Sequence, residues 1–359
     1  PAARSRDGDA TVARSTGKVR SARLTDLAAL GELSRLAQGD ADSMRSLGLP
    51  VSGPPIGVFS LFRLPLGAFQ PHDALYVYER DSHIAGLLRV ERDSARDEWT
   101  VVELDAVGGL DAGDVRFRLV QHLMRDGAKR GATRFHVACA DADDNVELFM
   151  QAGFVRFGDE RIMFRDPQRP LPAPWSDAEA QAARIRPSVP LDAVALARLY
   201  AAVTPAPVQR LECIRLPDWE RQGRDWRVPR SSLNPILRFA DVYTYVLESS
   251  GGGRDGTQLD AFLQIGVAKE DQPHYLKVIA RPKADVTPLT TFALGVIAER
   301  ADKSTLGREG VIAPVRTYEA PLDRRLEEAD FEDIATVTLL MKETLVRVAE
   351  PRLVPAGVR

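Results

Sequence analysis

The chain carries one sequence pattern twice, and the two copies begin in register. Residues 19–30 (VRSARLTDLAAL) match residues 185–196 (IRPSVPLDAVAL) at a single offset, with an arginine and an aspartate at the same places in each copy. The copies also end alike, because residues 149–154 (FMQAGF) and residues 326–331 (LEEADF) each lead into a predicted strand. A match at both ends of so long a unit indicates duplicated domains and not a short solenoid repeat.

The chain is long enough for two hydrophobic cores. Its 359 residues are 44% hydrophobic and 28% charged, which is typical of about two soluble globular domains. The first 17 residues have almost no apolar side chains to bury, and residues 166–177 carry four prolines, which favour extended backbone. Trp175, in the second of these segments, is expected to dock on a domain. We therefore predict a flexible tail (1–17), an N-terminal domain (18–166), a Pro-rich linker (167–182) and a C-terminal domain (183–359).

Charge and cysteine usage narrow the functional classes. The formal net charge is -3 and acidic residues interleave with the arginines, so no nucleic-acid partner is expected. Cys139 and Cys213 lack CxxC spacing and the five histidines are scattered, so the sequence predicts neither a metal site nor a disulfide framework. No apolar stretch of about 18 residues occurs, which favours a cytoplasmic protein with no membrane partner.

Hydrophobic periodicity predicts the same order of elements in both halves, and therefore a mixed α/β (α+β) fold. The first half reads as a strand (19–23), a helix (25–38), a hairpin (74–79 and 84–91), a strand (99–107), a helix ending at Gly131, a strand (135–138), a helix (143–152) and a last strand (154–165). The second half repeats this as 183–187, 191–202, 239–248, 259–267, 275–280, a helix around 289–297, 311–317, 322–329 and 331–348.

This order resembles the GNAT acetyltransferase superfamily, whose most recognisable ending, a helix running into a Gly-Phe pair and a strand, is similar to LFMQAGFVRFG at residues 148–158. The resemblance implies two tandem GNAT-like domains, each a mostly antiparallel twisted sheet flanked by helices. Two unrelated α+β domains are the alternative. A Rossmann fold is disfavoured because no GxGxxG follows a strand.

The resemblance also implies a site for acetyl-CoA at the start of the central helix. In the superfamily a turn of pattern Q/R-x-x-G-x-G/A binds the pyrophosphate with free helix amides. Here the two key glycine positions fall on Asp114 and Arg116, and Asp111 is nearby, so we expect repulsion of the phosphates. The corresponding turn of the second half has no glycine. The residues assigned to the cofactor are Val107, Gly108, Gly109 and Gly113.

Catalysis in many superfamily members uses a tyrosine as acid and a strand carboxylate as base. The tyrosine position is occupied here by Phe149 and, in the second half, by Leu326, and neither can donate a proton. Glu103 and Asp105 lie on the strand that supplies the base, so they are the candidate catalytic residues. The alternative is that both carboxylates simply face solvent.

A segment found only in the second half supplies candidate residues for the substrate cleft. Thr204-Pro205 ends a helix sharply, because proline disfavours helix in the residue before it. Tyr200, Thr204 and Gln209 then belong either to a binding lip over the acceptor or to a helix-breaking turn with structural side chains.

Two functions follow from the resemblance. The first is an acetyl-CoA-dependent N-acyltransferase, without a metal, that acts on the amine of a small molecule or protein. The second is a pseudoenzyme that keeps the tandem fold, does not use CoA, and binds a ligand or a protein partner as a scaffold.

Overall fold

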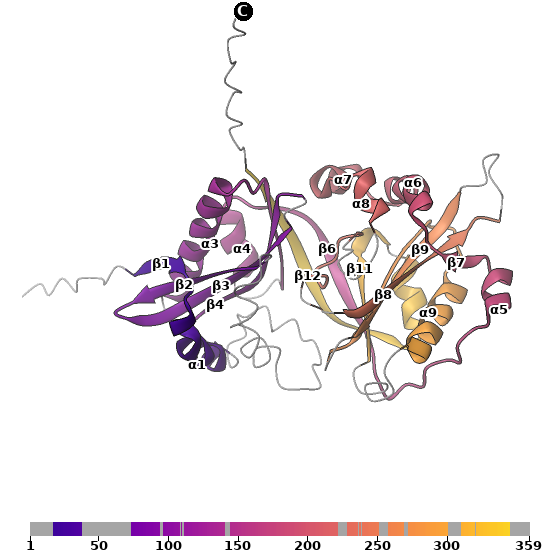
Figure 1. The fold of residues 1–359 in the computed structure, drawn as a ribbon, viewed down its shortest axis with the longest axis horizontal. Helices are drawn as coiled ribbons and strands as arrows, with labels where there is room; N and C mark the ends of the chain where they lie inside the picture. The colour runs from indigo at the N-terminus through magenta and orange to yellow at the C-terminus, as the bar shows by residue number, and fades with distance from the viewer. Residues whose placement is uncertain are drawn as a thin grey trace, which may run out of the picture.

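A single sheet of twelve strands runs through the computed structural model, with helices on both of its faces (Figure 1). The first half contributes β1 (Lys18–Ser21), α1 (Leu27–Ala37), β2 (Asp73–Arg80), β3 (His83–Asp93), β4 (Glu98–Ala106), α3 (Ala112–Lys129), β5 (Arg134–Ala140), α4 (Asn145–Gln151) and β6 (Val155–Arg165). The second half contributes α5 (Asp177–Ala182), β7 (Ile185–Pro187), α6 (Ala193–Val203), α7 (Ala206–Glu212), α8 (Leu216–Glu220), β8 (Phe239–Glu248), β9 (Leu259–Ala268), β10 (His274–Ala280), α9 (Thr287–Arg300), β11 (Val311–Arg316), α10 (Pro321–Glu327) and β12 (Phe331–Glu343). The predicted mixed α/β fold is confirmed.

The structure describes most of the chain between Gly17 and Thr344. The described residues are 17–37, 73–93, 96–107, 109, 111–140, 144–221, 228–235, 237, 239–250, 258–268, 272–300, 310–319 and 321–344. The predicted flexible tail therefore lies outside the described residues, apart from Gly17.

The two halves exchange their last strands. The sheet order is β1-β2-β3-β4-β5-β12-β6-β11-β10-β9-β8-β7, so β12 lies beside β5 and β6 lies beside β11. Both pairings are antiparallel, and in Figure 1 the yellow β12 runs beside the magenta β6 in the middle of the molecule. We expected each half to form its own sheet, and that expectation is wrong. The alternation within a strand encodes which face is buried, not which neighbouring strand it joins.

Reciprocal contacts at the helix ends accompany this exchange. On β12, Lys342 donates from Nζ to the carbonyl oxygen of Ala152 at the end of α4, at 2.5 Å. On β6, Arg165 donates from Nε to the carbonyl oxygen of Ala329, just after α10, at 3.0 Å. A cation at a helix C-terminus binds free carbonyls and favours the helix dipole. Each exchanged strand thus caps the last helix of the opposite half.

The arginine and aspartate of the repeated sequence form the same clamp in both halves. Arg20 binds both carboxylate oxygens of Asp26 at 2.7 and 3.0 Å, and Arg186 binds both of Asp192 at 2.8 Å. In each half the Nε of this arginine bonds a glutamate of the neighbouring strand at 2.6 Å. The sequence repeat is therefore a repeat of one bidentate ion pair, which joins an edge strand to the helix that follows it.

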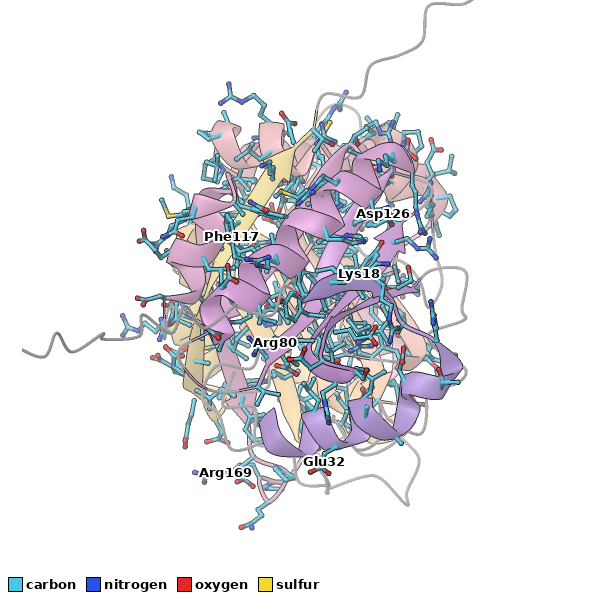
Figure 2. The ribbon with its side chains drawn as sticks, turned by 90° about the vertical axis from the view of Figure 1, so that its left-hand side faces the viewer. Lys18, Glu32, Arg80, Phe117, Asp126 and Arg169 are labelled. Atoms are coloured by element: carbon cyan, nitrogen blue, oxygen red, sulfur yellow. The ribbon has the colours of Figure 1, made fainter. Side chains whose placement is uncertain are left out.

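Helices cover opposite faces of the strands in each half. Figure 2 shows α3, with Phe117 and Asp126, on one side of the first-half strands and α1, with Glu32, on the other. Periodic apolar residues explain why α3 lies there, since its buried face includes Val115, Leu119 and Leu123.

In the second half the linker lies against α9, because the ring of Trp175 meets that of Phe292 with centroids 5.9 Å apart. The prediction that Trp175 docks on a domain is confirmed.

The clamps make stability depend on pH in a defined direction. The bond from Arg20 lowers the pKa of Asp26; burial alone would raise the pKa of Asp192, but bonds from Arg186 and the Val189 amide outweigh it and lower that pKa too. A carboxyl group with a lowered folded pKa contributes stability that is fully present above its unfolded pKa of about 4, and this is lost as the pH falls from there through the lowered folded pKa.

We predict that the double variant Asp26→Asn, Asp192→Asn is less stable at pH 7 by roughly 1–3 kcal/mol per clamp, because charge-assisted bonds are lost. Its free energy of unfolding should also fall less steeply than that of the natural protein between pH 5 and pH 3. Urea titrations at several pH values measure both quantities, with the exposed Asp177→Asn as control. A variant with the natural pH slope would contradict the role given to the clamps.

Candidate functional site

Two parallel strand pairs separate soon after they meet, one in each half. β4 pairs with β5 only from Glu98 to Thr100 and from Arg134 to His136, and β10 pairs with β11 only through two residues of each strand. We call the residues of β4 and β5 beyond this pairing (Val101–Ala106 and Val137–Ala140), which do not pair with each other, the first wedge. The unpaired remainder of β10 and β11 (Leu276–Ala280 and Ala313–Arg316) is the second wedge.

The candidate bases lie on the wall of the first wedge that β4 forms. Leu104 belongs to the core under α3, so its neighbours Glu103 and Asp105 point to the opposite face, as alternation in a strand requires. Their exposed fractions are 8% and 3%, so the alternative that these carboxylates face solvent is wrong. Arg89 on β3 donates from Nε to Glu103 at 3.2 Å. The wall thus presents one carboxylate held by an arginine and a second, deeply buried one.

The residues assigned to the cofactor do not form a glycine cradle. The Val107 amide donates to the carbonyl oxygen of Ala85 at 2.9 Å, so this amide is not available to a pantetheine arm. Gly109 has a φ of +127°, which favours glycine, but a side-chain carbon built at Gly109 or Gly113 would meet nothing within 4 Å. Neither glycine is therefore required for close approach within the fold. Gly108 lies outside the described residues.

Each aspartate at the start of α3 is paired with an arginine. Asp111 accepts a bond from Arg80 at 3.2 Å, and Asp114 accepts one from Arg118 at 2.7 Å. Arg116 is buried and donates from Nη1 to Asn145, the first residue of α4, at 3.0 Å. We call these two aspartates and three arginines the α3 seat. The N-terminus of this 18-residue helix adds partial positive charge to the seat.

The second wedge is tied shut by an ion pair. Lys277 on β10 donates from Nζ to the carbonyl oxygen of Pro314 on β11 at 3.1 Å, and to Glu319 at 2.8 Å. The same Glu319 oxygen accepts from the backbone amide of Arg316 at 2.9 Å. Lys277 is 1% exposed. Lys277 and Glu319, which bind each other, therefore also satisfy a carbonyl and an amide of β11 in the part of that strand that does not pair with β10.

The predicted cleft residues make structural contacts. Tyr200 donates to Oε2 of Glu212 at 2.6 Å, and burial raises the pKa of this tyrosine. Gln209 donates from Nε2 to the carbonyl oxygens of Ala201 and Thr204 at 3.0 and 2.6 Å, which caps the end of α6. Thr204 is buried and hydrogen-bonds Tyr318. These contacts support the helix-breaking turn over the binding lip.

The positions of the superfamily's tyrosine are buried in the two cores. Phe149 is 3% exposed and meets Phe154 edge to face, with ring centroids 5.2 Å apart, and Leu326 is 1% exposed. Neither position supplies a proton donor.

A buried network of charges at the junction of the halves was not predicted. On its first-half side, Glu160 of β6 contacts Arg316 at 3.0 Å and accepts bonds from the amide and hydroxyl of Ser232. Arg316 also donates to Glu212 at 2.9 Å. No local motif could have identified this network, because the bond between Arg316 and Glu212 spans 104 residues of sequence.

A second part of the network surrounds Glu98, at the start of β4. We define the Glu98 cluster as Glu98 with the four side chains that contact it: Arg96 at 3.4 Å, Arg134 at 3.3 Å, His136 at 3.6 Å, and Arg230 in close contact. Burial lowers the pKa of His136 to about 3, so its ring is neutral near pH 7. The cluster is thus three guanidinium groups around one carboxylate.

Comparison with known structures gives the fold. A tandem GNAT protein from the clavulanic acid biosynthesis pathway is 14% identical, with a TM-score of 0.54 over 91% of this chain and 98% of that one. A GCN5-related N-acetyltransferase from Sphaerobacter thermophilus is also 14% identical, with a TM-score of 0.53 over 91% and 95%. No family model and no curated protein matches the sequence. The chain has the tandem GNAT fold.

Two further observations concern the described residues alone. None of the helices among them combines the length and apolar character needed to cross a membrane. They also contain no group of three or more histidine, cysteine, aspartate or glutamate side chains placed to hold a metal ion.

The contribution of the ion pair between Lys277 and Glu319 to the second wedge can be tested directly. We predict that Lys277→Met lowers the free energy of unfolding by roughly 3–5 kcal/mol, because it leaves the Glu319 carboxylate without its cation in a buried place. The double variant Lys277→Met, Glu319→Gln should regain part of that loss. Urea denaturation at pH 7 measures both. A loss below about 1 kcal/mol for Lys277→Met would show that the pair does not hold the wedge together.

Proposed function

We propose that the protein is an acetyl-CoA-dependent N-acyltransferase whose chemistry lies in the first half, and that its second half is a structural copy. The observation that carries this proposal is the difference between the wedges. The first wedge has Glu103 and Asp105 on its wall, whereas Lys277 ties the two strands of the second wedge together. The fold of N-acetyltransferase neighbours supports the reaction class.

The α3 seat fits the charge of a CoA pyrophosphate, although it does not fit the superfamily's glycine turn. Arg80 and Arg118 bind the two aspartates that we expected to repel the phosphates, and Arg116 is a third arginine near the start of the same helix. Arginine suits phosphate because its planar fork donates two parallel bonds. Arg116 with the free amides of α3 would hold the pyrophosphate, and the bound cofactor would supply an activated thioester.

Asp105 is the better candidate for the base. It is seven positions beyond the start of β4 and is the more deeply buried of the two carboxylates, 3% exposed against 8% for Glu103. A base at this place takes a proton from the acceptor amine as it attacks, and positioning supplies the rest of the rate. Phe149 cannot donate a proton, so no side chain at this position would protonate the leaving thiol of a bound cofactor. A thiol pKa of about 8.5 allows that departure near neutral pH.

The pseudoenzyme remains a second candidate, favoured by one specific observation. The Val107 amide is bonded to Ala85, which removes a donor that the resemblance assigns to the pantetheine arm. Under this function the first half would bind a ligand or protein partner without turnover. Calorimetry with acetyl-CoA separates the two, since the pseudoenzyme should show no heat of binding.

We predict that Arg116→Met weakens acetyl-CoA binding by about 10-fold or more, because a charge-assisted phosphate contact is worth about 1.5–3 kcal/mol. The matched control is Arg125→Met on the same helix, an exposed arginine bonded to Gln121, which should leave the dissociation constant unchanged. Isothermal titration calorimetry gives both values. Equal effects of the two substitutions on the dissociation constant would show that Arg116 does not contact acetyl-CoA.

We predict that Asp105→Asn lowers kcat by roughly 10²-fold with a smaller change in KM, as expected for loss of a general base. Glu103→Gln should have the weaker effect, because Glu103 is the less deeply buried carboxylate. Release of free thiol from acetyl-CoA, measured across a panel of amines, reports turnover. A larger loss of kcat from Glu103→Gln than from Asp105→Asn would make Glu103 the base. No loss of kcat from either variant would support the pseudoenzyme.

A further inference from the structure

We infer that the second half sets the opening of the first wedge through the Glu98 cluster, with Arg230 as the positioning residue; as a statement about acyl transfer, this rests on the proposed function. The cluster spans the short pairing of β4 with β5, since Glu98 and Arg134 form its first residue pair and His136 belongs to its last. Arg230 is the member of the cluster that belongs to the second half.

Two arginines connect the halves here, and each makes contacts on both sides of the junction. Arg230 contacts Glu98 with its side chain, and its carbonyl oxygen accepts a bond from Arg316 of β11 at 2.9 Å. Arg96 contacts Glu98 and donates to the carbonyl oxygens of Glu212 and Cys213, at the end of α7, at 2.8 and 3.2 Å. The vertex of the first wedge is therefore tied to α7 and β11 of the second half.

The two walls of the first wedge belong to different blocks of the sheet. β4 is paired with β3 along its length, whereas β5 is paired with β12 from Arg134 to Ala140. Among the described residues, backbone pairing between the blocks is limited to the three residue pairs at the vertex, and the core under α3 covers one face of both walls. The Glu98 cluster adds side-chain contacts at these pairs. From Glu98 to Asp105 the strand spans roughly 20 Å, and a tilt of about 3° at the vertex would move Asp105 by about 1 Å. A displacement of that size can cost about 10²-fold in rate.

The test compares two arginines that join the halves at different places. Arg230→Met removes the contact at the vertex. Arg161→Met is the matched control, because Arg161 of β6 binds Asp323 and Asp333 of the second half at 2.5 and 2.7 Å but is not part of the Glu98 cluster. Both variants lose a guanidinium that links the halves. Thermal unfolding checks that their losses of stability are comparable.

The readouts are the acetyl-CoA dissociation constant and amide hydrogen exchange at residues 101–106 and 137–140. We expect Arg230→Met to raise the dissociation constant by about 10-fold or more and to speed exchange at both walls, and Arg161→Met to change neither by more than about 2-fold. Arg230→Lys keeps the charge but not the fork, so it should give an intermediate result and replaces Arg230→Met if that variant does not fold. Indistinguishable results for the two arginines would overturn the inference. If the natural protein does not bind acetyl-CoA, the proposed function fails, and the exchange comparison alone decides whether Arg230 sets the wedge.

Discussion

Pairing of β12 with β5 and of β6 with β11 is the constraint on which the rest of this structure depends. Without the partner half, β5 and β11 would each end in a row of unpaired backbone amides and carbonyls, which is costly and prone to association. The reciprocal caps from Lys342 and Arg165 reinforce the same exchange, because each joins the strand of one half to the last helix of the other. The two sequence repeats are therefore not two independent folding units.

The buried charges at the junction follow from the exchange. Glu160 enters the second half on β6 and meets Arg316 at the register position opposite it. Buried ion pairs add little net stability, but removal of one partner leaves an uncompensated charge and is strongly destabilising. The network therefore penalises any arrangement in which the halves are apart or slipped in register. The same network places Arg230 against Glu98, which connects the junction to the first wedge.

Duplication allows the two wedges to differ. In the second half, Lys277 and Glu319 satisfy backbone groups that separate strands would otherwise leave to water or a ligand. The first half has Glu103 and Asp105 buried on the wall of its wedge, and three arginines at the α3 seat. Under the proposed function, the first half would be the reactive copy and the second half the structural one.

The sequence predicted the parts of this molecule better than their assembly. The order of elements and the repeated Arg-Asp pair could be predicted because they depend on local periodicity and register. The strand exchange could not, because β12 carries no local mark of its neighbour. The ion pair of Asp111 could not be predicted for a similar reason, since its partner Arg80 is 31 residues away. For Tyr200 and Gln209 the sequence left a binding lip and a helix-breaking turn open; in the structure Tyr200 bonds the side chain of Glu212, and Gln209 caps the end of α6.

The central claim, that the exchanged strands make the halves one cooperative unit, can be tested by unfolding each half under its own probe. Trp99 is buried in the first half and Trp219 in the second, so two variants, each with one of these as the sole tryptophan of the four, report each half separately. Urea unfolding followed by fluorescence should give coincident midpoints and slopes for the two probes. Two separated transitions, with one half unfolding while the other stays native, would contradict the account.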